Sequence, residues 1–178
     1  LVISAFGKEF VGGGNDRMKN IGNENSVLRG EISEQGEEKM IAKVQSYALA
    51  GLEGVPVTVE TDISRGLPSY EMVGLPDAAV KESKERVRSA IKNSVLEFPA
   101  HKITVNLAPA YVRKEGSAFD LPIAISLLLA YGALRAEVGK TVFLGELALN
   151  GELRPVTGVL PALISARDKG YTDFIVPK

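Results

Sequence analysis

The stretch "KEGSAFDLPIAISLLLA", residues 114–130, joins a small polar turn directly to a strongly apolar segment. Its first part predicts a loop, because charged residues, glycine and serine follow one another without a break. Its second part predicts a helix that extends to about residue 134. A turn of this kind can hold a nucleophilic serine, cradle a phosphate, or do no more than start the helix.

Ser117 stands where this helix is expected to begin, and Asp120 follows three residues later. Ser-x-x-Asp ahead of an apolar run is typical of a capping box, in which the serine oxygen accepts a backbone N–H. A serine at a helix N-terminus can also attack a carbonyl if a base lies within hydrogen-bond reach. The local pattern favours capping, and a peptidase that uses Ser117 with Lys114 as its base is the alternative.

The chain on both sides of this stretch alternates between strands and helices. Period-two patterns predict strands over 43–51, 55–64, 69–74 and 102–109. Helices are expected over 76–95, with Pro76 in the first turn, and over 159–169, closed by Gly170. Asn150-Gly151 predicts a hairpin between strands over 141–149 and 151–156, and 173–178 is a final strand. The fold class is therefore α/β (α+β): one domain with a mixed, largely antiparallel sheet and three main helices.

The composition excludes several classes of protein. With 45% hydrophobic and 24% charged residues, the 178-residue chain is globular rather than disordered. It contains no cysteine and a single histidine, His101, so disulfides, thiol catalysis and multi-histidine metal centres are excluded. The sequence has neither an apolar run long enough to cross a membrane nor the layout of a secretory signal. We expect a cytoplasmic protein with no metal site.

Residues 1–39 differ from the rest of the chain. They contain "GGGND", "IGNEN" and an acidic run, and they lack sustained periodicity. The orderly pattern starts at Met40, whereas the chain opens on Leu1. We expect a disordered leader over 1–39 that is not part of the native protein, and a folded domain over 40–178.

The helix over 76–95 carries the candidates for nucleic-acid contact. At 100° per residue its cations gather on one stripe beside the apolar face, and they are Lys81, Lys84, Arg88 and Lys92. Such a stripe can follow a phosphate backbone even though the net charge of the chain is −1. The alternative is an ordinary solvated face, because Glu85 borders the stripe and Glu82 is spaced to pair with Arg86.

Two long stretches, "RGLPSYEMVGLPDAAVKESKERVRSAIKNS" and "FPAHKITVNLAPAYVRKEGSAFDLPIAI", resemble the N-terminal module of the bacterial ComM/YifB family. These are AAA+ ATPases related to magnesium chelatase, and the resemblance covers residues 40–178. It implies a Lon-protease-like module followed by an ATPase domain that uses ATP and Mg²⁺. It also implies a hexameric ring that acts on DNA in branch migration during natural transformation. The P-loop pattern G-x-x-x-x-G-K-[ST] is absent here, so we expect a fragment without a cofactor of its own.

The resemblance also bears on the turn at 114–118. Active Lon proteases carry Lys-Asp-Gly-Pro-Ser-Ala-Gly around the nucleophile and a lysine in a later Gly-Gly-Leu-Lys. In this chain Ala118 occupies the nucleophile position, Ser117 falls one residue early, and Leu160 replaces the lysine. The resemblance therefore implies a scaffold without proteolysis. We expect DNA contacts from the four cations of the helix, with Arg113 and Lys114 beside them. Small-molecule kinases that share the general fold need a glycine-rich loop, and "RKEGSAF" is too poor in glycine.

Overall fold

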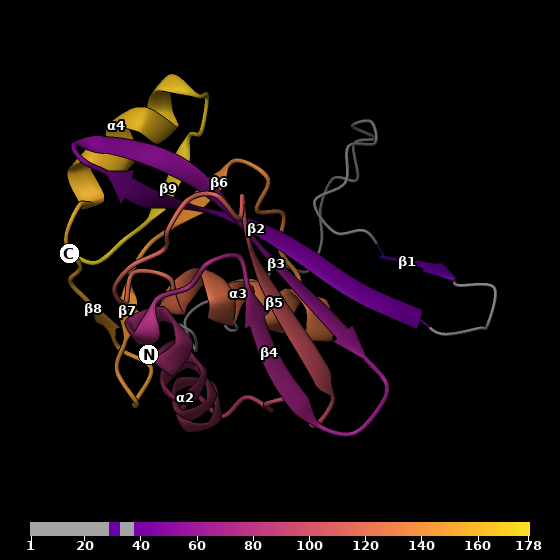
Figure 1. Ribbon diagram of the computed structural model, residues 1–178. Helices are drawn as coiled ribbons and strands as arrows, with labels where there is room; N and C mark the ends of the chain where they lie inside the picture. Colours follow the sequence, from indigo (N-terminus) through magenta and orange to yellow (C-terminus); the bar gives the residue numbers. More distant parts are fainter. Residues whose placement is uncertain (1–28, 33–37) are drawn as a thin grey trace, which may run out of the picture.

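The computed structural model of the chain describes residues 29–32 and 38–178 (Figure 1). Most of the expected leader, 1–39, lies outside the described residues. Within it, strand β1 (Arg29–Ile32) pairs antiparallel with β2, which begins at Glu38. The proposal that the native protein starts at Met40 stays a prediction.

The described residues form a mixed α/β domain. The remaining strands are β2 (Glu38–Ala50), β3 (Glu53–Ser64), β4 (Ser69–Val73), β5 (Lys102–Ala108), β6 (Thr141–Phe143), β7 (Glu146–Leu147), β8 (Leu153–Arg154) and β9 (Asp173–Ile175). The described helices are α2 (Ala78–Asn93), α3 (Asp120–Tyr131) and α4 (Val159–Asp168). The expected fold class, with its three helices, is confirmed.

The main sheet has the strand order β4-β5-β3-β2-β6-β9, and β1 pairs with β2 outside this path. Its two longest ladders, β2 with β3 and β3 with β5, are antiparallel. The pairings of β4 with β5, β2 with β6, and β6 with β9 are parallel. The sheet is therefore mixed, and antiparallel pairing dominates its centre.

Alternation along β2 places two cores on opposite faces of the sheet. Val44 and Ala48 face the larger core, whereas Tyr47 belongs to a smaller core together with Ala162 and Ala166 of α4. Helix α3 packs on β2 and β3 and also against α2. It is buried from Leu121 to Ala130 and apolar there except for Ser126, as expected for a helix enclosed on all sides. Figure 1 shows α4 near the β2–β3 turn, away from α2 and α3.

Several element boundaries differ from the sequence prediction. Helix α2 begins after Pro76 because Asp77 is its N-cap, with Oδ1 accepting the Val80 N–H at 2.8 Å. The strand expected over 141–149 is two short strands, because the chain turns at Gly145 (φ 152°) and leaves the sheet. The predicted Asn150-Gly151 hairpin is confirmed by the antiparallel pairing of β7 with β8. Across the part of the chain described above, no helix has the length and apolarity needed to span a membrane.

Candidate functional site

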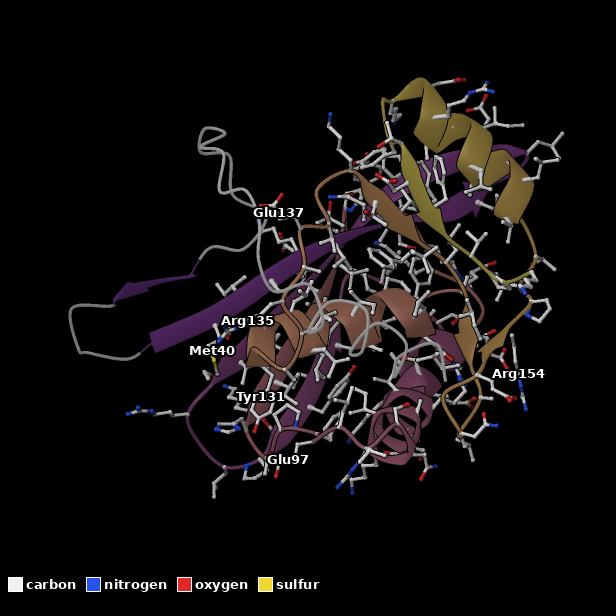
Figure 2. All side chains as sticks on the ribbon, turned by 180° about the vertical axis from the view of Figure 1, so that it is seen from behind. Met40, Glu97, Tyr131, Arg135, Glu137 and Arg154 are labelled. Atoms are coloured by element: carbon white, nitrogen blue, oxygen red, sulfur yellow. The ribbon has the colours of Figure 1, made fainter. Side chains whose placement is uncertain are left out.

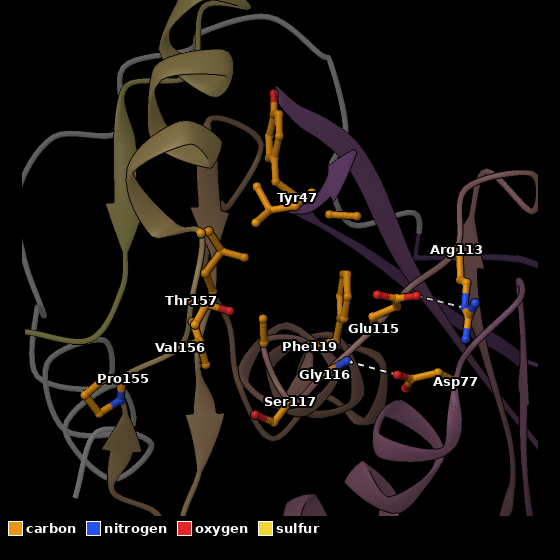
Figure 3. A pocket seen from close by; sticks show the side chains of 15 residues that line it. Tyr47, Asp77, Arg113, Glu115, Gly116, Ser117, Phe119, Pro155, Val156 and Thr157 are labelled. Carbon is orange, nitrogen blue, oxygen red and sulfur yellow. Dashed lines mark hydrogen bonds and ion pairs between the residues drawn. The ribbon is translucent and has the colours of Figure 1, made fainter. Parts of the chain in front are cut away.

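A cavity of about 580 Å³ lies beside the loop that the sequence singled out (Figure 3). Three segments enclose it: the end of β2, the loop before α3, and the loop before α4. Its lining residues are Tyr47, Ala48, Leu49, Asp77, Arg113, Glu115, Gly116, Ser117, Ala118, Phe119, Leu144, Pro155, Val156, Thr157 and Gly158. The lining therefore combines apolar side chains with hydroxyl and charged groups.

The cavity exists because two neighbouring strands separate. Strands β2 and β6 pair only at Gln45 and Val142. Beyond this point the chain after β6 bonds to the loop before α3 instead, since the Gly145 N–H donates to the Ala118 carbonyl at 2.9 Å. The Leu121 N–H donates to the Gly145 carbonyl at 3.0 Å. The end of β2 borders the cavity through Tyr47, Ala48 and Leu49.

The loop before α3 is fastened to the start of α2. Asp77 caps α2 through Oδ1, and its Oδ2 accepts the Gly116 N–H at 3.2 Å. The Asp77 N–H donates to the Lys114 carbonyl at 3.0 Å, and the Lys114 N–H donates to the Leu75 carbonyl at 3.3 Å. These hydrogen bonds therefore join the loop before α3, which forms one wall of the cavity, to the N-terminus of α2.

Lys114 contradicts the expectation that it contacts DNA. Its side chain is fully buried, and its Nζ donates to the carbonyls of Gly74 (2.7 Å) and Pro109. Burial lowers the pKa of the Lys114 ammonium. Lys114 is a structural donor that holds two loop carbonyls. It does not line the cavity, so it is not placed to act as a base for Ser117.

Ser117 lines the cavity but does not cap α3, which corrects the capping-box prediction. The N-cap residue is Phe119, and no side chain makes the capping hydrogen bond. Ser117 contributes its carbonyl, which accepts the Asp120 N–H at 3.2 Å. Ala118 lines the cavity, and Leu160 on α4 is 69% exposed and lies outside the lining.

Asp120 has a role that the sequence pattern missed. Its carboxylate is fully buried and accepts Arg86 Nε at 2.6 Å, Arg86 Nη2 at 2.9 Å and the Leu147 N–H at 3.1 Å. Burial raises the pKa of Asp120, while the Arg86 guanidinium and the Leu147 N–H oppose that shift. Arg86 was expected to pair with Glu82, and that contact exists only at 3.9 Å. An aspartate within an apolar run could have signalled a buried ion pair.

The cations expected on α2 differ in their surroundings. Lys81, Arg88 and Lys92 are exposed, and Lys84 is half-buried. Lys84 lies over the Tyr70 ring (5.6 Å to its centroid) and Arg88 over the Phe98 ring (5.7 Å). Arg113, at the cavity wall, forms an ion pair with Glu115 at 2.9 Å (Figure 3). The structure therefore leaves Lys81, Arg88, Lys92 and Arg113 accessible, and Arg113 is paired with Glu115.

The family resemblance implies ATP and Mg²⁺, and this chain does not fit them. Its sequence has no P-loop. Across residues 29–32 and 38–178, no three His, Cys, Asp or Glu side chains come together as a metal site. We therefore derive no step through ATP or Mg²⁺ in this chain.

Comparison with known proteins gives long similarities at high identity. The chain is 48% identical over 139 residues to competence protein ComM of Haemophilus influenzae, which covers 78% of this chain and 27% of that protein. It is 51% identical over 128 residues to YifB of Escherichia coli, covering 71% and 25%. A more distant similarity, 25% over 156 residues, links it to Lon protease of Mycolicibacterium smegmatis and covers 83% and 20%. The chain spans about a quarter of the length of the ComM and YifB relatives.

A family model described as subunit ChlI of Mg-chelatase matches residues 59–178. This range is well over half of the chain, and it includes the cavity loops, all of α2 and the Arg86–Asp120 ion pair. The chain belongs to the family of the Mg-chelatase subunit ChlI.

Proposed function

We propose that this chain is a non-catalytic module of a larger ATP-driven protein that remodels DNA, and that the exposed face of α2 contacts the phosphate backbone. The observation that carries the proposal is the 48% identity to ComM, a competence protein. ATP and Mg²⁺ then bind elsewhere in the whole protein, which works in the cytoplasm as a homo-oligomeric ring, and this chain supplies a rigid DNA-facing surface.

The accessible cations of α2 support this assignment. Lys81, Arg88 and Lys92 are exposed on a single helix. Each helical residue advances about 1.5 Å, so Lys81 lies about 10 Å from Arg88 along the axis and Arg88 about 6 Å from Lys92, which forms one row of positive charge for a phosphate backbone. Lys84 and Arg88 stack on aromatic rings, which reduces the conformational freedom that they lose on binding.

A peptidase that uses Ser117 is the weaker assignment. Its base, Lys114, is occupied by the carbonyls of Gly74 and Pro109. The position that aligns with the Lon nucleophile holds Ala118. A catalytic serine needs a base within hydrogen-bond reach, and Lys114 does not fill that role.

The surface assignment is tested by charge reversal with a matched control. Lys81→Glu/Lys92→Glu changes α2, and Arg135→Glu/Lys140→Glu makes the same charge change at exposed positions beyond α3. Figure 2 shows Arg135 near Tyr131, at the end of α3. Binding of a labelled single strand, a duplex and a four-way junction is measured by fluorescence anisotropy between about 50 and 200 mM salt.

We expect the α2 pair to weaken binding about tenfold and to reduce the slope of log K against log salt by about two. The control variant, Arg135→Glu/Lys140→Glu, should keep the affinity and the salt dependence of the wild type. Equal losses in the two variants, or none in either, would overturn the assignment of α2.

The motor half of the proposal is tested by the reading frame that follows the codon of Lys178. We expect the frame to continue into a G-x-x-x-x-G-K-[ST] motif. A stop codon directly after Lys178 would overturn the ATPase half while leaving the DNA-binding half to its own test.

A further inference from the structure

Tyr111 carries an aromatic ring that stands out into solvent between β5 and α3. Its side chain is 84% exposed, and within the part of the chain that the structure describes it is the only aromatic among the exposed large hydrophobic residues. Single exposed apolar residues are ordinary on protein surfaces. Tyr111 differs from them in how firmly its backbone is held and in the charges that lie beside it.

The turn that carries Tyr111 is fixed by hydrogen bonds from two sides. The Val112 N–H donates to the Pro109 carbonyl at 3.3 Å, which closes the turn. The buried Lys114 Nζ donates to the same carbonyl and also to the carbonyl of Gly74. A ligand that stacks on the ring therefore has to order only the tyrosine side chain, because the backbone is already in place.

Leu75 is a second exposed apolar residue attached to the same loop. It is 56% exposed, and its carbonyl accepts the Lys114 N–H at 3.3 Å. Its φ is 62°, in the left-handed region that is unfavourable for a residue with a Cβ. Strained backbone of this kind is concentrated at binding sites, where the surrounding hydrogen bonds hold it.

Hydrogen bonds also connect the Tyr111 loop to the row of positive charge on α2. The Asp77 N–H donates to the Lys114 carbonyl at 3.0 Å, and the Lys81 N–H donates to the Asp77 carbonyl at 3.0 Å. Lys81 thus lies one helical turn from the residue that is bonded to this loop. Arg113, which is exposed, follows Tyr111 by two positions.

A row of positive charge that ends beside an exposed aromatic ring is the arrangement by which proteins hold single-stranded nucleic acid. The cations follow the phosphate backbone, and an unpaired base stacks on the ring whatever its sequence. A duplex can use only the cations, because its bases are already stacked on one another inside the helix.

We propose that Tyr111 stacks on an unpaired base of a single DNA strand whose phosphates follow Lys81, Arg88 and Lys92. The inference rests on the proposed function and deepens it by naming single-stranded DNA as the preferred ligand of this surface. The cations of α2 bind both forms of DNA, and the Tyr111 ring adds affinity for the single strand alone.

The chain contains no tryptophan, which permits an optical test. Tyr111→Trp places the only tryptophan at the proposed stacking position. Leu52→Trp, the control, places it at a 91% exposed position in the β2–β3 turn, away from α2 (Figure 1). Each variant is titrated with a strand of about 15 thymidines and with a duplex of the same length. We expect saturable quenching of Tyr111→Trp by the single strand and not by the duplex, and no quenching of Leu52→Trp.

Affinities measured by fluorescence anisotropy test the same point without a tryptophan. Tyr111→Ala should weaken binding of the single strand about tenfold and leave binding of the duplex unchanged. Tyr111→Phe keeps the ring and should keep the wild-type affinity. Leu52→Ala, which truncates an equally exposed residue, should change neither affinity. The thermal unfolding curves of all three variants should match that of the wild type, because both positions are exposed.

The stacking inference and the proposed function can fail separately. If Lys81→Glu/Lys92→Glu weakens DNA binding while Tyr111→Ala keeps the wild-type affinity for the single strand, the stacking role is wrong and the α2 surface stands. Equal losses for single strand and duplex in Tyr111→Ala would also overturn the stacking role. Self-association of the wild type that Tyr111→Ala abolishes, measured by analytical ultracentrifugation, would assign the ring to a contact between copies instead. If the wild type binds no DNA, the proposed function fails and the stacking role fails with it.

Discussion

Arg86 on α2 and Asp120 at the start of α3 form a two-pronged ion pair in which the carboxylate is fully buried. The guanidinium reaches the Asp120 oxygens at 2.6 and 2.9 Å and the Ala79 carbonyl at 3.0 Å. Since Asp120 also accepts the Leu147 N–H, this one carboxylate joins α2, α3 and β7. The ion pair therefore fixes the position of α2 relative to α3.

Arg86→Ala should lower the free energy of unfolding by about 3–5 kcal/mol, because it leaves a buried carboxylate without its cation. Arg88→Ala, two residues along the same helix, is the control. It removes an exposed cation that stacks on Phe98 and should cost no more than about 1 kcal/mol. Urea unfolding measures the free energy of unfolding of both variants. Equal losses of stability would contradict the stabilising role given to the Arg86–Asp120 ion pair.

Lys114→Met should produce a stability loss that grows with pH. Burial lowers the pKa of Lys114 in the folded protein below its unfolded value of 10.5. The unfolded chain therefore binds more protons between these two values, and the stability of the wild type rises with pH, by at most about 1.4 kcal/mol per pH unit. A neutral amine still has two N–H groups for Gly74 and Pro109.

Methionine has no charge to lose and no N–H to donate, so the stability of this variant should stay level over that range. Urea unfolding between about pH 8 and 10 measures the difference. Parallel curves for the two proteins would contradict the assignment of Lys114 as the titrating group.

Tyr47→Phe should leave stability unchanged at neutral pH or raise it by up to about 1 kcal/mol. The Tyr47 side chain is buried, and its hydroxyl has no hydrogen-bond partner among the described residues. Burial raises its pKa from 10.0 to about 12. The folded form thus resists ionisation, and wild-type stability should fall as pH rises from about 10 towards 12.

The phenylalanine variant should lose less stability over that alkaline range, as followed by urea unfolding at each pH. Tyr111→Phe is the control, because Tyr111 is 84% exposed. If Tyr111→Phe reduces the loss of stability at alkaline pH as much as Tyr47→Phe does, burial of Tyr47 is not the cause of that loss.

Gly74→Ala should destabilise the protein by about 3–5 kcal/mol. Gly74 has φ 97°, and a Cβ there would lie 2.1 Å from the Leu107 carbonyl oxygen. Gly132→Ala makes the same substitution at φ 77° with no atom within 4 Å, so it should cost only about 1–2 kcal/mol of backbone strain. Thermal unfolding compares them, and equal shifts would mean that the contact with Leu107 relaxes freely.

The elements themselves could be predicted from local pattern. Period-two alternation located β3 and β5, Asn150-Gly151 located the β7–β8 hairpin, and Gly170 marked the end of α4 within two residues. These signals depend on neighbours in sequence, which is why they could be recognised. The split between β6 and β7 could not, because Gly145 leaves the sheet to bond with Ala118, 27 positions earlier in the chain.

The candidate site was predicted less well, for the same reason. Residues 115–118 of the loop that the sequence singled out line the cavity. The roles within it were wrong where they depended on distant atoms. Lys114 was expected at the surface and is buried on Gly74 and Pro109, and Asp120 was expected as a cap and pairs with Arg86.

The sequence alone determined the alternation of strands and helices and the identity of the apolar faces. Both are properties of residue types at fixed spacing. Only the tertiary structure decided that β2 and β6 separate after Gln45 and that a cavity lies beside the end of β2. It also decided which cations are exposed. The physical reason is that burial and hydrogen-bond partners are set by segments far apart in the chain, which local periodicity does not encode.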